Sequence, residues 1–153
     1  MTSACSTPAA APALRPGGRL VAQCGGEGNV AEIEAAIARV DEPALAGWAG
    51  PWNFASPAAT ERRLAAAGFS GIWTWRQHVR VEPDDPHEYF ATIMLGWHLE
   101  RIEPERRAGF VDEVLANLIE VSPARRVASD SPSATLRPSA NYVRLNILAR
   151  RPT

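Results

Sequence analysis

The stretch Leu14-Arg15-Pro16-Gly17-Gly18-Arg19-Leu20-Val21-Ala22-Gln23-Cys24-Gly25-Gly26-Glu27-Gly28-Asn29 decides the fold class of this chain. Pro16 and the two glycines after it predict a turn. The apolar run from Leu20 to Cys24, ended by further glycines, predicts a strand that is buried on both faces. Asn29 is the expected N-cap of a helix over residues 30–40, whose apolar residues recur at helical spacing. The order strand, glycine loop, helix indicates an α/β protein.

The rest of the sequence predicts a single domain over residues 14–152. Ser56 is expected to cap a second helix, with Pro57 in its first turn and Gly68 at its end. Alternation predicts a strand over residues 72–81 and another over residues 142–150. Between them, residues 87–100 are predicted to form an amphipathic helix whose inner, apolar positions recur at spacings of three and four: Tyr89, Phe90, Ile93, Met94, Trp97 and His98. A further helix is expected to open at Pro104. Its inner stripe is expected to be Phe110, Val114, Leu115 and Leu118. Residues 1–13 are expected to be a disordered tail, and residues 122–140 a mobile loop.

Composition narrows the function classes. The chain has 153 residues, of which 46% are hydrophobic, and 16 basic side chains face 17 acidic ones for a net charge of -1. With this balance the chain has no excess of positive charge to attract a phosphate backbone, so no nucleic-acid partner is expected. No apolar run reaches the length of a membrane span. Residues 1–13 carry neither the positive charge nor the leucine-rich run of a signal sequence, so none is expected. We therefore expect a soluble, cytoplasmic protein with no membrane partner.

The residues that carry metal and hydrolytic chemistry form no recognisable motif. The histidines His78, His87 and His98 have no partners at metal-ligand spacing, so no metal site is expected. Cys5 and Cys24 are expected to be reduced thiols, with Cys24 acting as a small core residue. No serine lies in a Gly-x-Ser-x-Gly elbow. The loop over residues 25–28 lacks the spacing of a phosphate-binding loop, and no catalytic residue is assigned.

Two blocks of sequence resemble a known family. Residues 14–21 resemble the leucine-x-proline-glycine-glycine turn before the fifth strand of S-adenosylmethionine-dependent methyltransferases with the seven-stranded Rossmann-like fold. Residues 64–70, Leu-Ala-Ala-Ala-Gly-Phe-Ser, resemble the turn before their sixth strand, and residues 142–150 would be the seventh. The resemblance implies a partial sheet in the order five, seven, six, with the last strand antiparallel and helices covering the sheet. Residues 23–29 and 50–54 further resemble the trans-aconitate-methyltransferase-like branch, whose members methylate small carboxylic acids.

The same resemblance places the cofactor outside this sequence. In the family, S-adenosylmethionine lies on the first half of the sheet, where a Gly-x-Gly-x-Gly turn lets the backbone approach it closely. This sequence has no such turn and no expected cofactor-binding residue. It resembles the substrate-side second half, which would bind S-adenosylmethionine poorly alone and would need a complementing N-terminal half. The apolar edge Leu20–Cys24 is expected to pair with that half or with a second copy of the chain.

The resemblance implies a site for a small-molecule methyl acceptor. Aromatic side chains with neutral polar neighbours on the covering loops and helices would form its walls, and a nearby arginine would anchor the acceptor. The expected residues are Trp52, Asn53, Tyr89, Trp97 and His98, with Trp48 beside them. One alternative is that these aromatics only pack helices on the sheet. The alternative function is a non-catalytic truncated remnant, or a small binding module that uses the aromatic pocket. A Gly-x-Gly-x-Gly turn encoded in the DNA just upstream would favour the enzyme.

Overall fold

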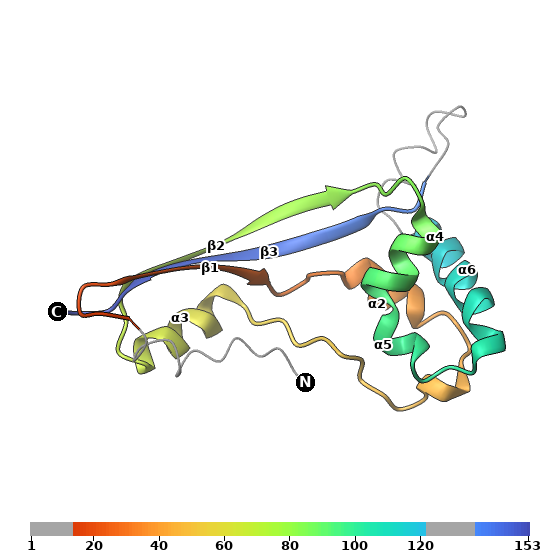
Figure 1. Ribbon diagram of the computed structural model, residues 1–153, viewed down its shortest axis with the longest axis horizontal. Helices are drawn as coiled ribbons and strands as arrows, with labels where there is room; N and C mark the ends of the chain where they lie inside the picture. The colour runs from red at the N-terminus through yellow and green to blue at the C-terminus, as the bar shows by residue number, and fades with distance from the viewer. Residues whose placement is uncertain (1–13, 122–136) are drawn as a thin grey trace. The chain divides into compact units, whose positions relative to one another are not determined.

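The computed structural model describes residues 14–121 and 137–153 and has an α/β fold (Figure 1). The expected tail and most of the expected loop at residues 122–140 lie outside these described residues. The elements are β1 (Arg19–Gly25), α2 (Ala31–Ile37), the 3-10 turn η2 (Pro43–Leu45), α3 (Pro57–Ala66), β2 (Ser70–Val81), α4 (Pro86–Tyr89), the π-helical turn η3 (Phe90–Met94), α5 (Gly96–Leu99), α6 (Pro104–Val121) and β3 (Ala140–Arg150).

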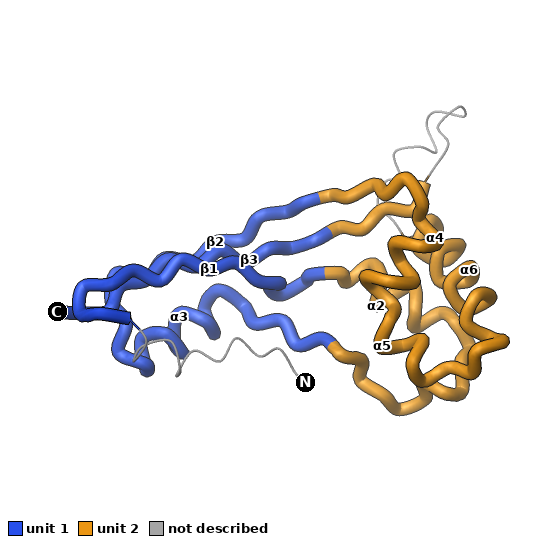
Figure 2. The backbone as a smooth tube through the Cα atoms, viewed as in Figure 1, with its two compact units in different colours: residues 1–29, 52–79, 142–153 blue, residues 30–51, 80–141 orange. Residues whose placement is uncertain are grey.

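The chain divides into two compact units, drawn in two colours in Figure 2. The first unit, residues 1–29, 52–79 and 142–153, contains α3 and most of the three strands. The second, residues 30–51 and 80–141, contains the remaining helices. The single domain expected from the sequence is therefore built as two units.

The sheet has the order β1-β3-β2, so the last strand of the chain lies in its centre. β3 is antiparallel to β1, with Val21 opposite Leu148 and Gln23 opposite Asn146. In Figure 1 the arrows of β1 and β2 point the same way. A central, antiparallel last strand is the arrangement that the resemblance implied.

Local signals set the ends of α3. The Ser56 side chain accepts a hydrogen bond from the Ala59 N–H at 3.2 Å, and Pro57 takes the first helical position. Gly68 follows the helix with a φ of +82°, the left-handed conformation that stops a helix at little cost for glycine. The predicted cap, first turn and end of this helix are all confirmed.

The first unit has its core between α3 and one face of the sheet. Leu64 and Phe69 pack there with Leu145, Ile147 and Ala149 of β3, and Leu20, Ala22, Cys24 and Ile72 lie against this cluster. The prediction that β1 is buried on both faces is wrong, because Arg19, Val21 and Gln23 alternate with these residues and are exposed. Cys24 takes the small core position that the sequence indicated.

The start of α2 differs from the prediction. Asn29 does not cap the helix; its Oδ1 instead accepts a hydrogen bond from the Val143 N–H at 2.8 Å. Val30 takes the N-cap position without a side-chain cap, at a φ of 53° that a β-branched residue rarely adopts. The asparagine therefore ties the glycine loop to β3, a long-range contact that local spacing does not reveal.

The helix expected over residues 87–100 is interrupted by η3. The Leu95 N–H donates to the Phe90 carbonyl at 2.8 Å, one residue beyond the α-helical partner. This inserted residue rotates the buried face, so Phe90, Met94, Leu95 and His98 are buried. Ile93 and Trp97, expected to point inward, are 62% and 54% exposed.

In the second unit, α2 packs against α6, and α4 also contacts α6. The α6 residues Phe110, Val111, Val114 and Leu118 are buried, so Val111 replaces the expected Leu115 in the inner stripe. Asn117 Nδ2 donates to the Ala36 carbonyl at 3.2 Å and links the two helices. Among the described residues, none of the helices has the length and apolar character to cross a membrane.

Candidate functional site

The glycine loop after β1 is filled by the protein itself. A side-chain carbon placed on Gly25 would lie 2.5 Å from Cε1 of the Phe54 ring and 2.9 Å from Asn29 Nδ2. One placed on Gly26 would lie 3.0 Å from Cβ of Leu145. These two glycines are thus required by contacts within the first unit. They do not form the open backbone turn that a dinucleotide or S-adenosylmethionine site needs.

Residues 52–55, where the chain re-enters the first unit, are hydrogen-bonded to this glycine loop. The Glu27 N–H donates to the Ala55 carbonyl at 3.0 Å, which holds residues 52–55 beside the glycine loop within the first unit. Trp52 is half-buried and Asn53 is exposed in this segment. Two of the expected acceptor-site residues therefore lie in the first unit.

The other three expected residues lie in the second unit, on α4 and α5. Tyr89 is half-buried and meets Phe90 edge-on, with ring centroids 5.7 Å apart. Trp97 is exposed, whereas His98 is only 3% exposed. The His98 ring lies edge-on to Trp48, with ring centroids 5.0 Å apart and an interplanar angle of 65°. The structure thus joins His98 to Trp48 and leaves Trp97 open to solvent.

Arg101 completes a cluster that we call the Trp48 cluster: Trp48, His98 and Arg101. Its guanidinium carbon lies 4.2 Å from the centroid of the Trp48 ring, a cation–π contact. A guanidinium stacked in this way keeps its in-plane N–H groups available to a carboxylate. The sequence suggested a nearby arginine without identifying it; the only signal was the spacing of three from His98, which places both on one helical face.

The environment of His98 keeps its imidazole neutral at pH 7. Burial, and to a smaller extent the positive charge of Arg101, lower the pKa of His98 from 6.5 to about 4. Neutral imidazole carries one N–H donor and one nitrogen acceptor. The cluster therefore offers a cation and a neutral polar ring beside an aromatic wall.

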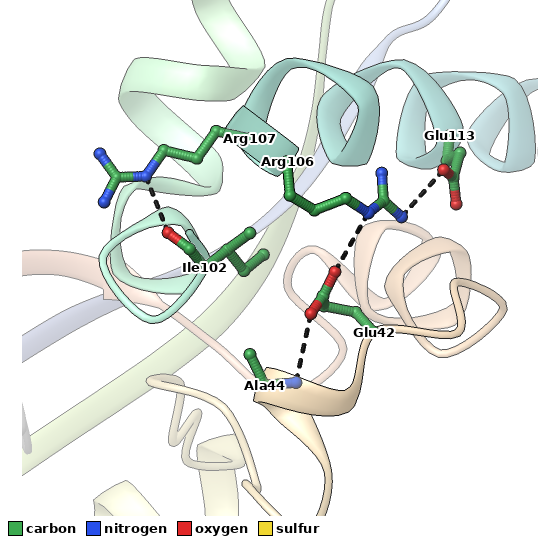
Figure 3. Close-up of polar contacts among 6 residues, drawn as sticks. All are labelled: Glu42, Ala44, Ile102, Arg106, Arg107 and Glu113. Carbon is green, nitrogen blue, oxygen red and sulfur yellow. Dashed lines mark hydrogen bonds and ion pairs between the residues drawn. The ribbon is translucent and has the colours of Figure 1, made fainter. Parts of the chain in front are cut away.

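An ion-pair bridge holds the turn that precedes Trp48 in the sequence, and Figure 3 shows the contacts of this bridge. Glu42 Oε1 accepts from the Ala44 N–H at 3.2 Å, which caps η2, and its Oε2 lies 3.3 Å from Nε of Arg106. Arg106 Nη2 also lies 2.9 Å from Glu113 Oε1 on α6. The Trp48 N–H then donates to the Leu45 carbonyl at 3.1 Å. Through these contacts α6 fixes the turn that presents Trp48.

The end of the short helix α5 is fixed in the same way. Arg107 Nε donates to the Ile102 carbonyl at 2.9 Å, which satisfies a backbone group in the link between α5 and α6 (Figure 3). The π-helical turn η3 lies immediately before α5 and turns His98 inward. Such turns often occur at functional sites because they reorient side chains. No group of potential metal ligands exists among the described residues.

Comparison with known proteins adds a similarity to solved structures. No protein-family model and no curated protein matches the chain. The chain is similar to a crystal structure from Bacillus halodurans C-125 that is described as a candidate methyltransferase, with 14% sequence identity and a TM-score of 0.46. The match covers 96% of this chain, which spans 57% of the length of that protein.

Proposed function

We propose that this chain is the acceptor-side half of an S-adenosylmethionine-dependent methyltransferase that acts on a small molecule, with a carboxylic acid as the preferred acceptor class. One observation carries the proposal: the last strand lies antiparallel between two strands that the Pro-Gly-Gly and Ala-Gly-Phe turns introduce. This combination of order and motifs is what the resemblance implies for the second half of that fold.

The first two glycines of the loop over residues 25–28 do not fit a close approach of the cofactor. Gly25 packs against Phe54 and Gly26 against Leu145, so the space that these two glycines leave is taken by the protein's own side chains. S-adenosylmethionine, the source of an electrophilic methyl group, would be held by a complementing half. The task of this chain is then to bind and orient the acceptor and to exclude water around it.

In the second unit we propose Tyr89, Trp97 and His98 as acceptor residues, and in the first unit, taken by itself, we propose Trp52 and Asn53. The second unit supplies the chemistry for a carboxylate, since Arg101 carries an N–H fork on the Trp48 ring. A neutral His98 does not compete with Arg101 for an acid, and it can donate one N–H. Exposed Trp97 supplies apolar surface for the carbon skeleton of the acceptor.

Substitution of the exposed residues separates binding from folding. Trp97→Ala and Asn53→Ala should each lower methyl transfer by at least about tenfold when the complementing half is present, because lost acceptor contacts raise the barrier. Both should change the melting temperature little, because neither side chain is buried. Transfer of a radiolabelled methyl group to a panel of small carboxylic acids measures the first effect. Asn141→Ala in the same unit as Trp97 is the control and should leave transfer unchanged.

The complementing half is sought first in the DNA just upstream, read in all three frames. A reading frame there that encodes a Gly-x-Gly-x-Gly turn would identify the candidate complementing half, which is then co-expressed with this chain for the transfer assay. If no frame encodes one, or if the joined halves transfer no methyl group, the proposal fails.

The second candidate function, a non-catalytic binding module, is favoured by the tight packing of His98, which is 3% exposed.

We further propose that the outer edge of β1 is the contact for that half or for a second copy. The Gly26 N–H donates to the Val143 carbonyl at 2.9 Å, and the Arg151 N–H donates to the Gly18 carbonyl at 2.8 Å. Because backbone groups alternate along a strand, the N–H and C=O groups of Val21 and Gln23 point to the opposite edge. No described strand pairs with that edge.

Val21→Pro tests this edge, because it removes an outward N–H and spares the ladder with β3. We expect the chain alone to associate at about 100 µM through Leu20–Cys24, and the variant to be monomeric by size-exclusion chromatography with light scattering. Val21→Thr retains the N–H and should behave like the unchanged chain. A monomer with or without the substitution would contradict the proposal.

A further inference from the structure

The sheet face opposite α3, which we call the open face, has no described element of the first unit over it. Ile72 lies in the core cluster under α3, and Thr74 Oγ1 donates to Glu61 Oε1 of α3 at 2.7 Å. Residues that alternate with these point the other way. The open face therefore comprises Arg19, Val21 and Gln23 of β1, Trp73, Trp75 and Gln77 of β2, and Arg144, Asn146, Leu148 and Arg150 of β3.

The centre of the open face is apolar and exposed. Val21 is 69% exposed, Trp73 is 61% exposed and Trp75 is 37% exposed. The two tryptophan rings lie against each other, with centroids 4.8 Å apart and an interplanar angle of 36°. Leu148 lies directly opposite Val21 and joins this centre. Exposed apolar side chains on one sheet face, two of them tryptophans in contact, are typical of an interaction surface.

The two ends of the open face are positively charged. Arg19 and Arg150 are cross-strand partners, and both are exposed. Like charges in such a pair repel each other unless an anion lies between them. At the other end, Arg144 Nη1 donates to Gln23 Oε1 at 3.1 Å, and Gln23 Nε2 donates to Asn146 Oδ1 at 2.7 Å, which holds the arginine over the face. None of the ten residues of the open face is acidic.

From this charge pattern we propose that the open face binds an amphipathic helix of another polypeptide, with acidic residues near both ends of the helix. Sheet faces are covered by helices whose apolar stripe packs on them. Arg150 and Arg144 are six residues apart, which is about 20 Å along a strand. A helix of about 13 residues spans that length. Its apolar stripe would cover Trp73 and Val21, and its carboxylates would pair with the arginines at each end.

Charge complementarity distinguishes this occupant from the others. A second copy of the chain would bring its own three arginines against these three, which is unfavourable. Residues 1–13 contain no acidic side chain, and residues 122–136 contain Arg125 and Arg126 against the single Asp130. Neither segment can neutralise the face. Nucleic acid would also supply anions, but it would leave the aliphatic side chains of Val21 and Leu148 without an apolar cover.

Two synthetic helical peptides test the proposal on the chain alone, without any methyl transfer. They share one leucine stripe and carry either glutamates or lysines near both ends. We expect the glutamate peptide to bind at least about tenfold more tightly by calorimetry and to shift the fluorescence of Trp73 and Trp75. The double variant Arg19→Glu/Arg150→Glu should reverse the preference. The control Arg62→Glu/Arg63→Glu makes the same change of charge on exposed residues of α3, and it should leave the preference for the glutamate peptide unchanged.

Several results would overturn the proposal. Equal affinity for both peptides, no binding of either, or a preference that survives reversal of the arginines would each do so. Tighter binding of a single-stranded oligothymidylate or of phosphatidylserine vesicles than of the glutamate peptide would assign the face to nucleic acid or to a lipid surface. The Trp73→Ser variant checks the apolar centre, because it should weaken the glutamate peptide while leaving its charge preference intact.

Discussion

Acidification from pH 7 to pH 4 is expected to destabilise the chain by about 3 kcal/mol through His98 alone. Burial, and then the charge of Arg101, hold the pKa of His98 at about 4 in the folded chain, against 6.5 when it is unfolded. Protons therefore bind the unfolded state first. The stability contributed by neutral His98 is complete above pH 6.5, and it is lost as the pH falls from 6.5 toward 4.

His98→Gln isolates this effect, because glutamine keeps a polar side chain that cannot titrate. Urea unfolding of both proteins across this pH range gives the difference in their free energies of unfolding, in which the carboxyl groups that they share cancel. We expect that difference to shrink by about 3 kcal/mol as the pH falls. A constant difference, or a nuclear magnetic resonance titration of His98 centred near pH 6.5, would show that the imidazole is not held in the Trp48 cluster.

Gly25→Ala is expected to destabilise the folded chain by about 2–3 kcal/mol with no cofactor present. The added carbon would overlap the Phe54 ring and the amide of Asn29, and Asn29 cannot move without losing its bond to the Val143 N–H. A glycine kept free for a ligand would behave differently. Its replacement would lower ligand affinity and leave the stability of the empty protein nearly unchanged.

Gly96→Ala is the matched control for Gly25→Ala. Nothing lies within 4 Å of a side-chain carbon placed on Gly96, which begins α5. Alanine there should be neutral or stabilising by up to about 1 kcal/mol, because it favours the helix. Thermal unfolding of both variants measures the contrast. Equal melting temperatures would mean that the glycine loop is open and that its fit to a ligand must be reconsidered.

Features that depend on local spacing could be predicted from the sequence. Ser56, Pro57 and Gly68 fix α3 through their own backbone preferences, and the central antiparallel position of β3 followed from the motif resemblance. Asn29 was wrongly expected to be a helix cap, because its bond to Val143 joins residues 114 positions apart. No local pattern carries that information.

The predicted acceptor residues illustrate a second limit. A spacing of three and four residues predicted that Ile93 and Trp97 would be buried. The extra residue of η3 changes which side of the helix faces the core, so Leu95 and His98 are buried there. A π-helical turn arises from packing on both sides of a helix and has no simple sequence signature. The contact of Arg101 with Trp48 depends equally on a turn that Glu42 and Arg106 hold in place.

Titration calorimetry of S-adenosylmethionine into the chain alone tests the central claim most directly. The claim is that this chain supplies the acceptor side and that the cofactor-binding residues belong to another half. Because the glycine loop is filled by Phe54 and Leu145, we expect no saturable heat of binding. Stoichiometric binding with a micromolar dissociation constant would contradict the claim, since it would place a complete cofactor site within these 153 residues.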